Sequence, residues 1–171
     1  LVGAFLGGTQ YQGLLARELP GAQVAPLSET QERSRYSVGE HAVIHGRGVS
    51  IRFIASAAVS AQLDCIRQVL AEQAEPDRVV FRAGIVLAML TNAHPYRDGN
   101  GRVGRVLFNL ALRQGGMPPT CYVALSEISN RSRGGYEIRL RQTETQAHWE
   151  PYLLYLCDVI RLQATWSGPR Q

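Results

Sequence analysis

The chain has 171 residues, and all 18 of its basic residues are arginine, because the sequence contains no lysine. A P-loop, a protein-kinase site and a pyridoxal-phosphate site each need a lysine, so these three classes are excluded. With 45% hydrophobic residues and a formal net charge of +4, the composition predicts one globular unit that handles any phosphate through arginines or backbone amides.

The cysteines and the lack of long apolar runs indicate the cellular compartment in which the protein is expected. The three cysteines are an odd number, lie far apart and form no C-x-x-C spacing, which argues against a disulfide framework or a zinc site and indicates a reducing compartment. No apolar run approaches the roughly 18 residues of a membrane span, and the opening LVGAFLGG is too short for a signal peptide. We therefore expect a cytoplasmic protein with no membrane partner, or one delivered into a host cell as an effector.

The first half of the chain predicts helices around one hairpin. Residues 9–19 carry a short helical pattern, and a polar connecting loop follows at 21–37. In 42–54, β-branched residues flank a glycine-containing turn, which predicts a β-hairpin. In 57–72, apolar residues recur every three or four positions, which predicts an amphipathic helix.

The second half predicts the centre of a helical bundle. The segment 78–93 is apolar almost all round, as in a buried central helix, and Pro95 should end that helix near His94. Apolar periodicity predicts three further helices, from about Val103 to the glycine pair at 115–116, within 126–144, and from about Glu150 to Gln163. The expected fold is mainly α, a helical bundle with one small β-hairpin.

Between two of these helices lies a short segment with many reactive residue types, HPYRDGNGRVGR at 94–105. Gly99 and Gly101 permit backbone conformations that turn successive N–H groups towards one point, at the start of a helix whose first amides lack intrahelical partners. Such a place binds anions, phosphate above all. Arg102 and Arg105 lie three apart on the helix, so both guanidinium groups can reach the same anion.

Two further side chains extend this set. Asp98 can lie beside a bound phosphate if Mg²⁺ separates them, since magnesium is commonly held by one or two carboxylates together with phosphate oxygens. A neutral imidazole at His94 could take the proton of an attacking hydroxyl. Alone, a histidine before proline is more often a capping or packing residue, and D-G-N-G is more often a turn. Their combination with two arginines at helical spacing indicates a phosphate-handling site.

The string HPYRDGNGRVGR resembles the signature of the Fic (Fido-fold) family, H-P-F-x-D-G-N-G-R-x-x-R, and departs from it only at Tyr96, where phenylalanine is usual. The added hydroxyl needs a partner if it is buried. The resemblance divides the chain into an N-terminal helix and loop at 1–35 with no clear resemblance, a Fic core domain at 36–165 with a flap at about 42–54 and the motif at 94–105, and a C-terminal tail at 166–171.

This resemblance implies a protein adenylyltransferase that moves AMP from ATP to a serine, threonine or tyrosine hydroxyl of a target protein. It places the general base on His94 and magnesium on Asp98. The remaining implied nucleotide contacts are Gly99, Asn100 and Gly101 as the anion hole for the α- and β-phosphates, Arg102 and Arg105 on the outer phosphates, and Tyr136 near the base. Family members that transfer phosphate and bind the nucleotide in the reverse sense carry lysine at the position of Gly101, and this chain has no lysine.

The hairpin corresponds to the flap of the family. An extended target segment can add to an exposed strand edge through backbone N–H and C=O groups, which would bring its hydroxyl to His94. On this interpretation the target-binding residues lie on both strands, at Ala42, Val43 and Ile44 and at Val49, Ser50 and Ile51. They would fix the position of the target more than its sequence. The pattern alone equally favours a hairpin that only covers the core.

An inhibitory helix is only weakly indicated. Many Fic proteins carry [S/T]-x-x-x-E-[G/N], whose glutamate pairs with the second motif arginine. The closest string here is S-E-T-Q-E at 28–32, followed by Arg33 where glycine or asparagine is expected. Ser28 with Gln31 fits a capping box better. We therefore expect any inhibitor upstream of Leu1 or on a separate, antitoxin-like chain.

Two alternatives stay open. A Fic fold could transfer another phosphate-containing group, such as UMP or phosphocholine. A non-enzymatic module could instead bind phosphate or nucleic acid through a basic loop of Arg97, Arg102 and Arg105. The scattered arginines and moderate net charge do not favour nucleic acid.

Overall fold

The computed structural model describes residues 41–46, 49–73, 75–96, 98–118, 120–132 and 134–166. The helix predicted at 9–19, the string at 28–33 and Arg97 lie outside these described residues. Within them, no helix is both long enough and apolar enough to cross a bilayer.

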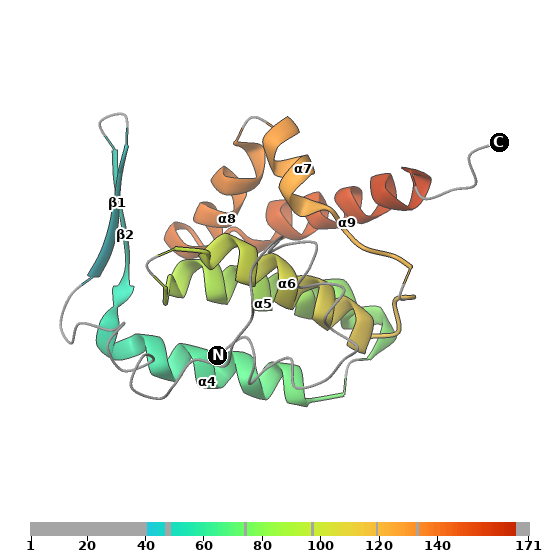
Figure 1. The fold of residues 1–171 in the computed structure, drawn as a ribbon, viewed down its shortest axis with the longest axis horizontal. Helices are drawn as coiled ribbons and strands as arrows, with labels where there is room; N and C mark the ends of the chain where they lie inside the picture. The colour runs from blue at the N-terminus through green and yellow to red at the C-terminus, as the bar shows by residue number, and fades with distance from the viewer. Residues whose placement is uncertain are drawn as a thin grey trace.

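Most of the described chain is helical, and one two-stranded sheet accompanies the helices (Figure 1). The elements in chain order are β1 (His41–Gly46), β2 (Val49–Ala55), α4 (Ser56–Ala71), the 3-10 helix η2 (Pro76–Arg78), α5 (Val79–Ala93), α6 (Asn100–Gln114), α7 (Leu125–Arg131), α8 (Gly135–Thr145) and α9 (Trp149–Trp166). The prediction of a mainly α bundle with a small β-hairpin is confirmed.

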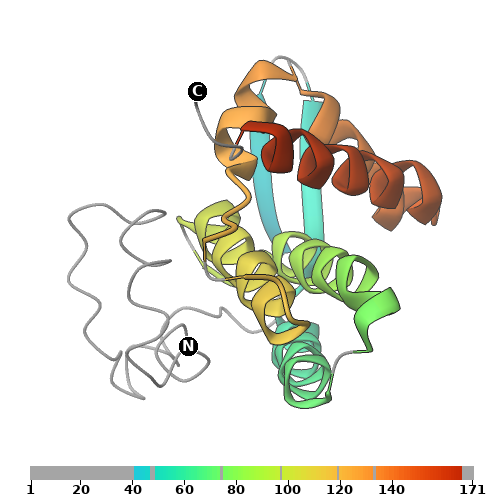
Figure 2. The same ribbon diagram turned by 90° about the vertical axis from the view of Figure 1, so that its right-hand side faces the viewer.

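The helices form three layers. Figures 1 and 2 show α5 and α6 side by side in the middle, α4 on one side of this pair, and α7, α8 and α9 on the other. Helix α5 contacts α4, α6, α8 and α9, so it occupies the centre of the bundle, as its apolar sequence predicts.

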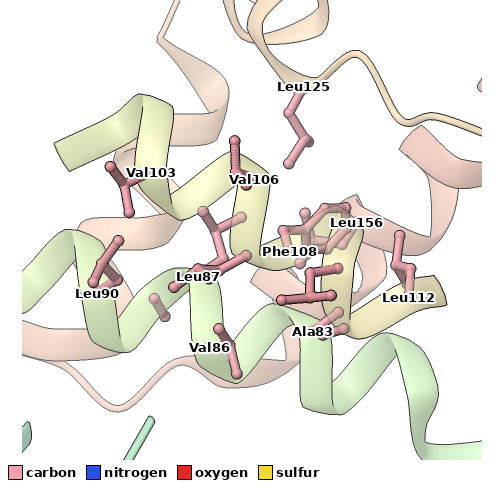
Figure 3. Packing of buried hydrophobic residues seen from close by; sticks show 14 of the residues in the cluster. Ala83, Val86, Leu87, Leu90, Val103, Val106, Phe108, Leu112, Leu125 and Leu156 are labelled. Atoms are coloured by element: carbon pink, nitrogen blue, oxygen red, sulfur yellow. The ribbon is translucent and has the colours of Figure 1, made fainter. Parts of the chain in front are cut away.

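The interface between α5 and α6 is the heart of the core. Figure 3 shows Leu87 and Leu90 of α5 pointing towards Val103 and Val106 of α6. Leu87, Leu90 and Val106 are fully buried, and burial of each such side chain contributes about 1.5–3 kcal/mol. Residues 94–99 of the 94–105 segment join these two helices, and residues 100–105 form the start of α6, so the packing of the two helices fixes both ends of the loop.

Gly104 lets α6 approach α5 closely. A Cβ atom at this position would lie 3.0 Å from Leu87 Cδ1 and 3.1 Å from Thr91 Oγ1. Gly104 is therefore a packing residue, which lets the first turns of α6 lie against the last turns of α5.

The hairpin stands at the end of the bundle where α5 ends and α6 begins (Figure 1). Its strands are antiparallel, with Ile44 opposite Ile51 and Val43 opposite Arg52, and the register shifts between His41 and Val43. The hairpin predicted at 42–54 is confirmed to within one residue. A hydrogen bond from Arg141 Nη2 of α8 to the Arg52 carbonyl, at 3.2 Å, ties β2 to the helices.

The expectation of one helix within 126–144 is wrong, because two helices, α7 and α8, occupy this region. Helix α7 ends at Arg131, and Gly134, at the start of α8, has a left-handed backbone with φ of 90°. A residue in this conformation cannot continue an α-helix, and glycine adopts it without steric cost. The residue pattern did not reveal this break between the two helices.

Candidate active site

His94 follows the last residue of α5 and adopts a left-handed conformation, with φ of 47° and ψ of 53°. Its N–H still donates to the Leu90 carbonyl, at 3.1 Å. Pro95 disfavours continuation of the helix, which explains why α5 ends where the sequence predicts. A left-handed non-glycine residue costs about 1–3 kcal/mol. The surrounding structure must therefore stabilise His94 in this position.

Asn100 closes the loop between α5 and α6. Its Oδ1 accepts a hydrogen bond from the Tyr96 N–H at 2.9 Å, and its Nδ2 donates to the Tyr96 carbonyl at 2.6 Å. The residue is only 3% exposed. Because both ends of its amide are engaged with the loop, Asn100 can serve an anion site through its backbone and not through its side chain. Tyr96 itself is buried in the core.

The first turn of α6 presents unpaired backbone donors. Gly99, with φ of 88°, caps the helix without a side-chain hydrogen bond, and the Val103 N–H donates to the Gly99 carbonyl at 2.9 Å. Intrahelical bonding thus starts at Val103, which leaves the preceding amides for another acceptor. No acidic residue lies in the first turn. The helix dipole and these amides together favour an anion here.

A cavity of about 360 Å³ lies at this end of α6. Its lining consists of seven of the residues that the sequence predicts, His94, Asp98, Gly99, Asn100, Gly101, Arg102 and Arg105. The imidazole, the helix N-terminus, both guanidinium groups and the carboxylate therefore face one space. Its volume falls in the range of about 300–1,000 Å³ that is usual for small-molecule sites.

Asp98 and Arg102 form an ion pair in this structure, at 2.6 Å between Oδ2 and Nη2. The side chains are 89% and 44% exposed, respectively. An exposed pair of this kind is worth at most about 1 kcal/mol. The sequence analysis predicts that Asp98 binds magnesium and that Arg102 binds phosphate. In this structure the two side chains neutralise each other, and such ligands would have to compete with this ion pair.

Arg105 lies against Gly101. A Cβ atom at Gly101 would lie 3.1 Å from Nη1 of Arg105, so a larger residue there would press on the guanidinium group. The positive charge of Arg105 also acts on the Tyr136 hydroxyl. Burial strongly raises the pKa of Tyr136, and Arg105 opposes this shift.

Tyr136 is not among the residues that line the cavity. It is 7% exposed and belongs to the hydrophobic core, and its ring centroid lies 6.4 Å from that of Tyr155. The expected approach of Tyr136 to the base of a nucleotide stays a prediction.

The His94 ring is partly shielded from water, and this burial lowers the pKa of His94 below its ordinary value of 6.5. The main chain of Thr91 opposes the shift. Nδ1 is buried and makes no hydrogen bond of ordinary geometry with the described residues. A lowered pKa keeps the imidazole neutral near pH 7, which is the form that accepts a proton.

The six flap residues lie on the hairpin as predicted, with Ile44 opposite Ile51 and Ser50 opposite His45. Ala42 lies at the register shift, and Val49 pairs with Gly46 at the turn end of β2. Among the described residues the sheet contains only β1 and β2, so each strand has one edge without a strand partner in this part of the chain. This arrangement is compatible with strand addition.

Phe53 lies at the site but was not predicted from the sequence. Its ring stacks on the His94 ring, with 4.0 Å between centroids and 19° between planes. Phe53 lies near the end of β2, and its side chain is buried. The aromatic residue at the end of the hairpin was a visible signal, but only the fold brings it to the histidine.

The Fic/DOC family model matches residues 19–112, which include the hairpin, α4, α5 and most of α6. This match covers more than half of the chain, so the protein belongs to the Fic/DOC family. It is a transferase of the Fic fold, in a family that usually transfers nucleotide or phosphate groups.

Replacing Asn100 by alanine should damage both stability and ligand binding. The Asn100→Ala variant removes both hydrogen bonds between the Asn100 side chain and the main chain of Tyr96, which should lower the free energy of unfolding by about 1–3 kcal/mol. The loop that shapes the helix N-terminus should then open, and affinity for ATP with Mg²⁺ should fall. Denaturant unfolding and calorimetric titration measure the two effects.

Asn109 supplies the matched control. It is equally buried and does not line the cavity, and its side chain bonds the main chain of Val123 and the Arg105 carbonyl, with no hydrogen bond to Tyr96. Asn109→Ala should destabilise the fold to a similar extent and retain ATP binding in the folded protein. An equal loss of ATP affinity in both variants would contradict a specific role of Asn100 in the site.

Proposed function

We propose that this protein is a magnesium-dependent protein adenylyltransferase that transfers AMP from ATP to a serine, threonine or tyrosine hydroxyl of another protein. The observation that carries the proposal is the shared cavity. His94 lines the same space as the N-terminus of α6, Arg102 and Arg105. A proton acceptor and a phosphate-binding surface thus lie together, as nucleotidyl transfer requires.

The phosphates of ATP fit the backbone of residues 99–101. The amides at the start of α6 are fixed by the helix, so they can stabilise charge on the phosphates without reorganisation. Arg102 and Arg105 add charge-assisted hydrogen bonds. These donors are all supplied without lysine, in agreement with the composition of the chain.

His94 acts as the general base. Its neutral imidazole takes the proton from the target hydroxyl while the hydroxyl oxygen attacks the α-phosphorus. A bond forms between this oxygen and the α-phosphorus, the bond to the bridging oxygen of the β-phosphate breaks, and pyrophosphate leaves with the bonding electrons. Positioning and charge stabilisation carry most of the catalysis, and no covalent enzyme intermediate is needed.

Asp98 is the residue that would hold magnesium. It is the one carboxylate in the cavity lining, its side chain is 89% exposed, and the described residues contain no group of three or more candidate metal ligands. A single carboxylate fits magnesium, which takes its other ligands from water and phosphate oxygens. Bound there, the ion would neutralise charge on the phosphates. Arg102 is then released from Asp98 and becomes available to the nucleotide.

The target protein is proposed to bind along the flap. An extended segment that adds to the free edge of the hairpin would place its hydroxyl at the cavity, because the hairpin stands at the end of the bundle that carries His94 (Figure 1). Backbone hydrogen bonds would set the register of the target, so that sequence preference is modest. Restraint by an inhibitory segment upstream or by a separate antitoxin-like chain belongs to the same proposal.

The proposal is tested by incubating the protein with α-labelled ATP, Mg²⁺ and cell lysate. Label should appear on protein, and omission of Mg²⁺ with a chelator should abolish it. His94→Ala should reduce transfer by about 10²–10⁴-fold through loss of the base, while ATP still binds. His148→Ala, which removes an exposed histidine, is the control and should transfer normally.

Other outcomes identify other functions. Label from UTP or from a phosphocholine donor, with none from ATP, would replace adenylyl transfer by another group. Salt-sensitive retention of nucleic acid that survives His94→Ala and is lost in Arg102→Ala, without any transfer, would show a binding module instead. Transfer from ATP that is unchanged in His94→Ala would refute the role of His94.

The acid dependence of the rate should reflect the lowered pKa of His94. The imidazole must be neutral to accept a proton, so transfer should rise with pH through the pKa of His94 and level off above it. Because burial holds this pKa below 6.5, the midpoint should also lie below 6.5. The profile of kcat/KM against pH measures it, and a midpoint above 6.5 would contradict the shielded, neutral base.

A further inference from the structure

We propose that Phe53 is a positioning residue that fixes the His94 ring for proton transfer and couples it to the flap. This inference rests on the proposed function, since it assigns Phe53 a role in aiming the general base. Phe53 touches neither the phosphates nor the target in this account. It acts through the histidine.

The contact between the two rings is close and nearly parallel. Their centroids are 4.0 Å apart and their planes differ by 19°, whereas aromatic pairs usually lie about 4.5–7 Å apart. Phe53 is 8% exposed, yet it is not among the residues of the main hydrophobic cluster. Its strand β2 contacts both α4 and α5, so Phe53 is buried where the hairpin meets the helices.

His94 needs such support. A catalytic histidine is usually oriented by a hydrogen bond on the nitrogen that does not react. Here the main chain of Thr91 lies beside the ring, but the buried Nδ1 makes no hydrogen bond of ordinary geometry among the described residues, so this support is weak. The backbone at His94 is also left-handed, which directs the side chain away from the path of α5. Contact with the face of the ring by Phe53 then takes over part of the orienting role.

Phe53 is itself held by a fixed backbone. Its neighbour Arg52 pairs with Val43 of β1, and the Arg52 carbonyl accepts a hydrogen bond from Arg141 of α8 at 3.2 Å. The residue that orients the base therefore belongs to the same strand that is proposed to receive the target. Displacement of β2 would move Phe53 relative to His94, so the base is aimed only when the flap is in place.

Two substitutions of Phe53 distinguish an effect of ring stacking on His94 from an effect of side-chain volume alone. Phe53→Leu keeps an apolar side chain of similar size but removes the flat ring, and Phe53→Tyr keeps the ring. Phe81→Ala is the control for aromatic loss elsewhere, since Phe81 lies on α5 with 50% exposure. For each full-length variant, kcat and KM for ATP, the thermal midpoint, and the three-bond couplings that report the χ1 rotamer of His94 are measured.

Phe53→Leu should lower kcat by about 10- to 100-fold, because a misdirected base loses alignment with the hydroxyl. KM for ATP should stay near the wild-type value, since the phosphate site on α6 is untouched. The His94 couplings should become averaged over rotamers. Phe53→Tyr should restore kcat and a single rotamer, and Phe81→Ala should match the wild type in both.

The proposal is overturned if Phe53→Leu turns over like the wild type with one His94 rotamer. It is also overturned if Leu and Tyr variants lose kcat equally, or if every loss follows the thermal midpoint. The three-bond couplings of His94 can be measured without any transfer activity. If the wild type transfers no AMP, adenylyl transfer fails as the function, and the rotamer of His94 in the Leu and Tyr variants still decides whether Phe53 orients the ring.

Discussion

The two hydrogen bonds between the Asn100 side chain and the Tyr96 main chain are the constraint on which the site depends. The chain must leave α5 at His94, reverse its direction and enter α6 at Asn100 within a few residues. A buried amide that satisfies both main-chain groups of Tyr96 holds this reversal closed. As a result, the end of one central helix and the start of the next open into one cavity, where the proposed base meets the proposed phosphate donors.

The electrostatics of the cavity follow from the same arrangement. The N-terminus of α6 and two arginines make it attractive to anions, while the Asp98 carboxylate satisfies one of the arginines in the absence of ligand. Because that ion pair is exposed, it opposes ligand binding only weakly. Burial keeps His94 neutral at a position where a charged imidazole would be disfavoured. The absence of lysine thus has a structural counterpart, since backbone amides and guanidinium groups supply every phosphate donor in the proposed site.

Residue patterns were sufficient for the features that depend on local chemistry. The apolar sequence of α5 predicted its central position, Pro95 predicted its end, and the motif predicted the seven residues that line the cavity. Patterns failed where contacts between distant segments decide. Gly134 starts a second helix where one was expected, and Phe53 reaches His94 only because the hairpin docks at one end of the bundle. The inward direction of the Asn100 side chain and the burial of Tyr136 likewise depend on packing that no local spacing encodes.

In the proposed function, the cavity directs the α-phosphate of ATP, and not the γ-phosphate, towards the hydroxyl that His94 deprotonates. Parallel reactions with ATP labelled at the α-phosphorus and at the γ-phosphorus distinguish the two, with labelled protein counted after removal of free nucleotide. Label should appear on the target from α-labelled ATP alone, with the γ-label recovered as pyrophosphate. Label on the target from γ-labelled ATP would contradict this proposal, because the nucleotide would then bind in the reverse sense and the protein would transfer phosphate.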